Sequence, residues 1–95
     1  MKASAHVKII LTVTGLDHEG IVAAVATRLA ERKVNILNIS QTLMDNYFTM
    51  ILQGSFDESS QSIQDLQAAF EEVEKEQGLQ IRIQSESIFD AMHTL

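Results

Sequence analysis

The feature that most constrains this chain is an abrupt change of hydrophobic period around residues 15–22. Before it, over residues 7–13, apolar and polar side chains largely alternate, which is typical of a half-buried β-strand. After it, over residues 22–29, apolar side chains repeat at helical spacing. Gly15 can adopt backbone conformations closed to other residues, and Gly20 has no side chain to block a close neighbour. The segment therefore predicts a strand, a glycine-containing loop and a helix.

The rest of the chain repeats these two patterns. Asp45 and Asn46 separate two apolar runs, and both residue types tolerate the left-handed conformation of a tight hairpin. Gly78 is a natural helix stop. The expected elements are strands at 34–44 and 47–54, a helix that begins after several N-cap candidates at 57–60 and ends at Gly78, a strand at 79–84 and a short helix at 87–95.

This order of elements predicts an α+β ferredoxin-like βαββαβ sandwich in one domain, residues 1–95. Its four-stranded antiparallel sheet should have the order 4-1-3-2, with two helices on one face. Ile10 and one alternating set from the second and third strands should form the opposite face, which looks too apolar to face water. We therefore expect a homodimer or higher oligomer, and both edge-to-edge and face-to-face pairing remain open.

Charge and composition exclude several classes of function. The formal net charge is −6, with 13 acidic residues against 7 Lys and Arg, which argues against direct binding to nucleic acid or an anionic membrane. The chain has no cysteine, so it can form neither disulfides nor thiolate sites. Its N-terminus lacks the apolar segment of a signal peptide, and no stretch approaches transmembrane length. These features indicate a cytoplasmic protein.

The start of the first helix is the clearest candidate for a small-molecule site, because its free amide groups favour an anionic ligand group. Asp17 could cap this helix or contact a ligand amine, and capping is the stronger interpretation. His18 beside Asp17 and Glu19 invites a metal or acid–base role, which His6 and His93 could in principle join. No recognised metal-site spacing supports it, so a solvated His18 is the better interpretation and no metal is expected. No combination of residues supports nucleophilic catalysis, and no cofactor motif is present.

The order of elements, with Gly15-Leu16-Asp17-His18-Glu19-Gly20-Ile21-Val22 and then Val34-Asn35-Ile36, resembles the ACT domain over roughly residues 7–86. The strings Ile39-Ser40-Gln41-Thr42-Leu43-Met44-Asp45-Asn46-Tyr47-Phe48-Thr49-Met50 and Ile88-Phe89-Asp90-Ala91-Met92-His93 look like the small stand-alone bacterial ACT proteins. The resemblance implies a regulatory module without enzymatic activity. It also implies amino-acid binding at an interface between paired domains.

By this resemblance, the site is formed by the first strand–helix loop and the start of the second strand. The implied ligand-binding residues are Asp17, His18, Glu19, Gly20, Ile21 and Asn35. Asn35 offers both donor and acceptor groups to an amino acid, and it could equally tie down a loop. The expected function is therefore a non-catalytic regulatory module that binds an amino acid or similar small molecule and acts on an unidentified protein partner. The alternative is a constitutive protein-interaction module whose ligand pocket is unused.

Overall fold

The structure is a computed structural model that describes residues 6–92 of the chain. Its elements are β1 (His6–Leu16), α1 (Ile21–Glu31), β2 (Asn35–Met44), β3 (Tyr47–Asp57), α2 (Ile63–Gln77), β4 (Leu79–Ser85) and α3 (Glu86–Met92). The predicted order of strands and helices is confirmed. The expected C-terminal helix begins one residue earlier, at Glu86, and residues 93–95 of that prediction lie outside the described part of the chain. Within residues 6–92, no helix has the length and apolar character needed to cross a membrane.

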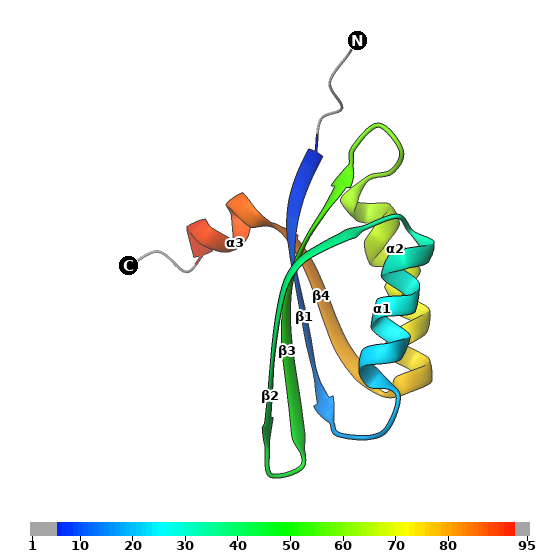
Figure 1. Cartoon of the computed structure of the whole chain (residues 1–95), viewed down its shortest axis with the longest axis vertical. Helices are drawn as coiled ribbons and strands as arrows, with labels where there is room; N and C mark the ends of the chain where they lie inside the picture. Colours follow the sequence, from blue (N-terminus) through cyan, green and yellow to red (C-terminus); the bar gives the residue numbers. More distant parts are fainter. Residues whose placement is uncertain (1–5, 93–95) are drawn as a thin grey trace.

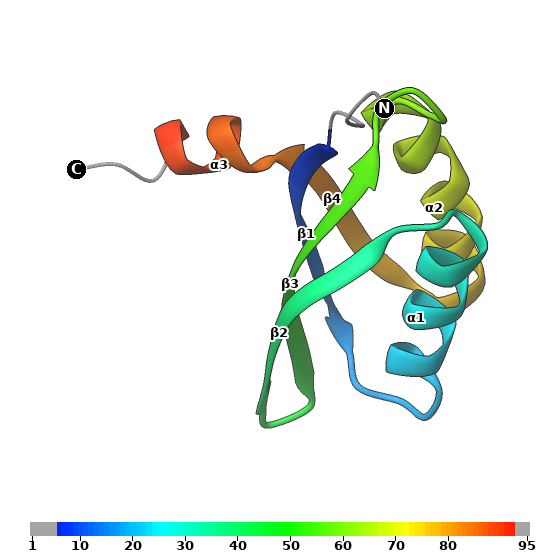
Figure 2. The same cartoon turned by 45° about the horizontal axis from the view of Figure 1, so that its top comes forward.

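The four strands form one sheet in the order β2-β3-β1-β4, with every neighbouring pair antiparallel. This order is the predicted 4-1-3-2 read from the other edge. Helices α1 and α2 lie together on one face of the sheet (Figure 1). Helix α3 lies on the opposite side in both views (Figure 2). The central strands are therefore β3 and β1, and the edges are β2 and β4.

The core lies between the sheet and the two helices, as the hydrophobic periods predict. Alternate residues of β1 and β3 face α1 and α2 and are removed from water, because successive side chains of a strand point to opposite faces. Leu29 from α1 and Phe70 from α2 contribute the facing helical stripes, with 0% and 1% of their surfaces exposed. The largest fully buried side chains are Phe56, Phe70, Ile9, Leu11, Leu29, Met50, Leu52, Leu66, Val13 and Val25.

The turns follow local sequence signals, with one correction. Asp45 is left-handed at φ 54°, as the hairpin prediction requires. Gly78 ends α2 at φ 66°, also as predicted. Helix α2 is not capped from residues 57–60, however. It begins with a capping box in which the Ser62 hydroxyl accepts from the backbone N–H of Asp65, and the Asp65 carboxylate accepts from that of Ser62.

The two glycines of the first loop prediction exchange their expected roles. Gly15 belongs to β1, and its φ is not positive. A Cβ atom on Gly15 would lie 2.7 Å from the Leu79 side chain and 3.3 Å from the Gly78 carbonyl oxygen. Gly20 has φ 88° and open space around it. Gly15 is therefore required for close packing, whereas Gly20 is required for its left-handed backbone.

The exposed apolar surface lies only partly where the sequence analysis places it. The sheet face opposite α1 and α2 is largely polar on β1, which places Thr12 and Thr14 there, and Ile10 is only 9% exposed. Exposed apolar side chains gather mainly on the edge strand β2 and the hairpin that follows it. The most exposed of them are Leu43 (57%), Met44 (70%) and Tyr47 (63%). The expectation of an apolar open face therefore holds on β3, where Tyr47 and Ile51 (44%) are exposed opposite the buried set, and is wrong on β1. The edge of β2 is a further unpartnered apolar surface.

Candidate ligand-binding site

The loop between β1 and α1 is tied to the β2–β3 hairpin. The backbone N–H of Asp17 donates a 2.7 Å hydrogen bond to the carbonyl oxygen of Asn46. The residues from Asp17 to Gly20 are all exposed, and Ile21 is buried with 2% of its surface exposed. Ile21 therefore anchors the loop in the core and leaves only its backbone available to a ligand.

The start of α1 carries no side-chain cap. Gly20 occupies the N-cap position, and the first helical hydrogen bond runs from the N–H of Ala24 to the carbonyl oxygen of Gly20 at 2.9 Å. Asp17 is thus not the helix cap, which corrects the stronger of its two interpretations. The first turn of α1 also lacks an acidic side chain. The backbone N–H groups of this turn can therefore donate hydrogen bonds to an anionic group of a ligand.

His18 is exposed, but it is not simply solvated. Its Nδ1 atom lies 2.9 Å from the carbonyl oxygen of Glu19, and its Nε2 atom lies 2.8 Å from that of Gln77. These two carbonyl oxygens raise the pKa of His18 above its ordinary 6.5, and the nearby Asp17 carboxylate adds a smaller effect in the same direction. Sequence reasoning could not find Gln77, because 59 residues separate it from His18.

Asn35 lies at the other end of the sheet from the loop. It pairs with Ser55, which pairs with Lys8, whereas Leu16 at the end of β1 pairs with Tyr47. Lys8 and Leu16 are eight residues apart on β1, which corresponds to roughly 26 Å along the strand. Within one chain the structure brings residues 17–21 together and leaves Asn35 apart from them.

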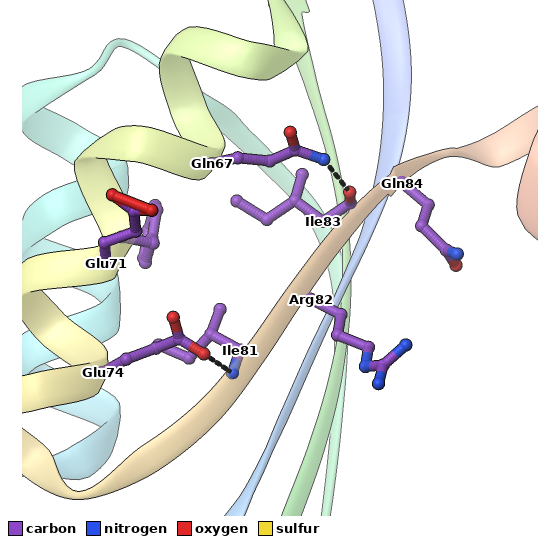
Figure 3. A pocket seen from close by; sticks show the side chains of 8 residues that line it. Gln67, Glu71, Glu74, Ile81, Arg82, Ile83 and Gln84 are labelled. Atoms are coloured by element: carbon purple, nitrogen blue, oxygen red, sulfur yellow. Dashed lines mark hydrogen bonds between the residues drawn. The ribbon is translucent and has the colours of Figure 1, made fainter.

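A hollow of about 330 Å³ lies between α2 and the outer edge of β4. Two side chains from α2 reach the strand there (Figure 3). Glu74 accepts from the backbone N–H of Ile81 at 2.7 Å, and Gln67 donates to the carbonyl oxygen of Ile83 at 2.9 Å. Two hydrogen bonds thus cross the hollow and cover backbone groups on the outer edge of β4. The run of acidic residues Glu71, Glu72, Glu74 and Glu76 is typical of a solvated helix face, but the Glu74 carboxylate is instead turned to the strand.

Within the described residues 6–92, no group of three or more His, Asp or Glu side chains is placed to hold a metal ion. His18 instead uses both ring nitrogens in contacts with backbone carbonyl oxygens. His93, the third histidine considered as a metal partner, lies outside the described residues.

Comparisons with known proteins agree with this fold. The family model described as "ACT domain" matches residues 8–84. A UPF0237 protein of Corynebacterium diphtheriae is 58% identical over 86 residues, covering 90% of this chain and 97% of that protein. A UPF0237 protein of Neisseria meningitidis serogroup A is 48% identical, covering 90% of this chain and 96% of that protein.

Among solved structures, an ACT domain protein from Streptococcus pneumoniae is 45% identical and superposes with a TM-score of 0.78. The match covers 92% of this chain and 98% of that one. The chain therefore matches small ACT proteins over nearly their whole length, as well as matching the family model. It belongs to the ACT-domain family, a family of regulatory ligand-binding modules.

Proposed function

We propose that this chain is a non-catalytic regulatory module that pairs as a homodimer and binds a small carboxylate-bearing molecule, such as an amino acid, at the subunit interface. Its membership of the ACT-domain family supports a regulatory role. The formal net charge of −6 supports partners other than nucleic acid or anionic membrane, and a cytoplasmic location fits the cysteine-free composition. The single observation that carries the proposal is the exposed apolar edge of β2.

The two edges of the sheet differ in a way that favours β2 as the subunit contact. Side chains of α2 close the outer edge of β4 through Gln67 and Glu74. Every residue of β2 is exposed, and its apolar side chains include Ile39 and Leu43. A long exposed apolar edge strand is a template for pairing with another strand. A second copy of the same strand is the simplest partner, because one two-fold axis satisfies both copies.

Such a pairing would also complete the predicted ligand site. About a two-fold axis, two β2 strands run antiparallel, so the start of one lies near the end of the other. The end of β2 leads into the hairpin whose Asn46 is bonded to Asp17. Asn35 of one copy would therefore approach the β1–α1 loop of the second copy. The roughly 26 Å that separates them within one chain is then no obstacle.

The chemistry of the two halves suits an amino acid. The uncapped start of α1 offers backbone N–H groups to a carboxylate. The side-chain carbonyl of Asn35 or the carboxylate of Asp17 can accept from the ammonium group. A ligand that binds the paired arrangement more tightly than the free chain would shift the assembly equilibrium, which is what a regulatory module requires.

The dimer contact is tested by sedimentation of the wild type and Leu43→Lys. Lysine on an edge strand opposes pairing, so this variant should be monomeric at concentrations where the wild type is a dimer. Ile88→Lys is the matched control, because Ile88 is similarly exposed (55%) but lies on α3, which packs against β1 and β4. A wild type that is monomeric at micromolar concentration would count against the proposal, as would a Leu43→Lys dimer.

The ligand is tested by a thermal-shift screen of the twenty amino acids, since a compound specific to the folded dimer raises its apparent stability. Calorimetry then compares wild type and Asn35→Ala with the amino acid that gives the largest shift. Loss of one or two hydrogen bonds should weaken binding by about 1–3 kcal/mol, or roughly 5- to 150-fold. Asn38→Ala is the control, because the Asn38 side chain bonds to the adjacent backbone N–H of Ile39. Equal affinity of Asn35→Ala and wild type would remove Asn35 from the site.

One observation favours the alternative of a constitutive protein-interaction module. The exposed carboxylate of Asp17 lies in the loop that leads into α1, where it would repel a ligand carboxylate. If no amino acid stabilises a wild-type dimer, the β2 contact stands without a ligand. The chain would then act through a protein partner alone.

A further inference from the structure

The contacts of His18 carry an inference about the β1–α1 loop itself. Both ring nitrogens lie at hydrogen-bond distance from backbone carbonyl oxygens, those of Glu19 at 2.9 Å and Gln77 at 2.8 Å. A carbonyl oxygen only accepts, so each contact requires an N–H on the ring. Neutral imidazole has one N–H, whereas imidazolium has two. The observed arrangement is therefore satisfied only when His18 is protonated.

The surroundings of the ring favour that charged form. Gln77 is the last residue of α2, and carbonyl groups at a helix C-terminus carry partial negative charge. The carboxylate of Asp17, in the loop, also raises the pKa of the ring. The last turn of α2 carries Glu74, Lys75 and Glu76, and the Glu74 carboxylate is held by the backbone N–H of Ile81. Carbonyl oxygens and one carboxylate thus face the imidazolium.

Loss of the proton would break one of the two contacts. The nitrogen without a hydrogen would then present its lone pair to a carbonyl lone pair, which is repulsive. The loop would keep its second tether, the bond from Asp17 N–H to the Asn46 carbonyl oxygen. It would remain joined to the hairpin while its link to the end of α2 weakens.

We propose that protonated His18 is a clasp that holds the β1–α1 loop against the C-terminal end of α2, which makes the conformation of this loop depend on pH. His18 is in this view a positioning residue, not a ligand-binding one. Given the proposed function, the clasp fixes the loop that presents the start of α1, and affinity for a carboxylate ligand should weaken as His18 loses its proton.

The test uses the full chain without any ligand, so its failure is distinct from failure of the proposed function. NMR titration of the His18 ring protons should give a pKa above 6.5. Amide exchange across residues 18–20, corrected for the intrinsic dependence on pH, should become severalfold faster between about pH 6 and about pH 8. In His18→Gln, which cannot titrate, this change should disappear. His6→Gln, at the start of β1, is the matched control and should keep it.

A His18 pKa at or below 6.5 would overturn the proposal that protonated His18 holds the loop against α2. So would wild-type exchange rates that keep the same corrected value across the titration. A pH dependence that persists unchanged in His18→Gln would assign the effect to another group and would equally overturn the proposal.

Discussion

The Oε2 atom of Glu74 accepts a 2.7 Å hydrogen bond from the backbone N–H of Ile81, and this contact closes part of the outer edge of β4. Gln67, two helical turns earlier on α2, donates a hydrogen bond to the carbonyl oxygen of Ile83 on the same edge (Figure 3). The strand is thereby protected from pairing with another chain. On this basis the β4 edge of the sheet is partly covered, and the β2 edge is open.

Glu74→Ala should lower the free energy of unfolding by about 1 kcal/mol, because the N–H of Ile81 loses its partner at a half-buried position. The double variant Gln67→Ala/Glu74→Ala should also gain a tendency to self-associate, since the N–H of Ile81 and the carbonyl of Ile83 are then free to pair with another strand. Urea unfolding and sedimentation measure the two effects. Glu71→Ala on the same helix removes the same charge and should change neither quantity appreciably. Equal loss of stability in Glu71→Ala would contradict this role for Glu74.

Gly15→Ala should destabilise the protein by about 1–3 kcal/mol through overpacking. The new Cβ atom would lie 2.7 Å from the Leu79 side chain, which can shift, but also 3.3 Å from the carbonyl oxygen of Gly78, which belongs to the backbone. Thermal unfolding measures the effect. Gly15→Asn should be at least as harmful as alanine, because the larger side chain meets the same neighbours. Stability equal to that of the wild type would show that this region of β1 and β4 is loosely packed.

At Gly20, asparagine should destabilise the protein less than alanine does, which is the reverse of the order expected at Gly15. A Cβ atom there meets nothing within 4 Å, so the cost arises from the left-handed backbone at φ 88°. Gly20→Ala should cost about 1 kcal/mol, and Gly20→Asn should cost less, because asparagine tolerates this conformation better. Thermal unfolding of the two variants side by side decides the point. Asparagine proving worse than alanine would indicate crowding that the structure does not contain.

The capping box of α2 predicts a defined loss of stability in acid. Hydrogen bonds from the backbone N–H and side chain of Ser62 lower the pKa of Asp65 below its ordinary 3.8. A carboxyl group with a lowered folded-state pKa stabilises the protein above the unfolded pKa. This contribution is lost as the pH falls through the folded value. The stability difference between wild type and Asp65→Asn should therefore shrink as the pH falls below 3.8.

The control for this effect is Ser62→Ala, which keeps the backbone N–H of residue 62 and removes only the hydroxyl, so NMR titration should show the pKa of Asp65 moving part of the way toward its ordinary value. An Asp65 pKa that is the same in this variant and in the wild type would mean that the Ser62 side chain is not one of the causes.

Local sequence signals determined the order of the elements and most of their ends. The hydrophobic period changes between 2 and 3.6 residues wherever a strand meets a helix, so the topology could be predicted before the structure. Asp45 and Gly78 mark turns through their own backbone preferences and needed no distant partner. The residues of the β1–α1 loop could likewise be predicted as one group, because they are adjacent in the chain.

The tertiary structure decided everything that depends on which segments meet. Gly15 owes its role to Leu79, and His18 owes its role to Gln77, both more than 55 residues away along the chain. The distance between Asn35 and the loop follows from strand register, which the pairing of β2 with β3 fixes. The closed edge of β4 depends on where α2 packs. Residue preferences act over a few neighbours along the chain, whereas these contacts exist only once the core has set the positions of the elements.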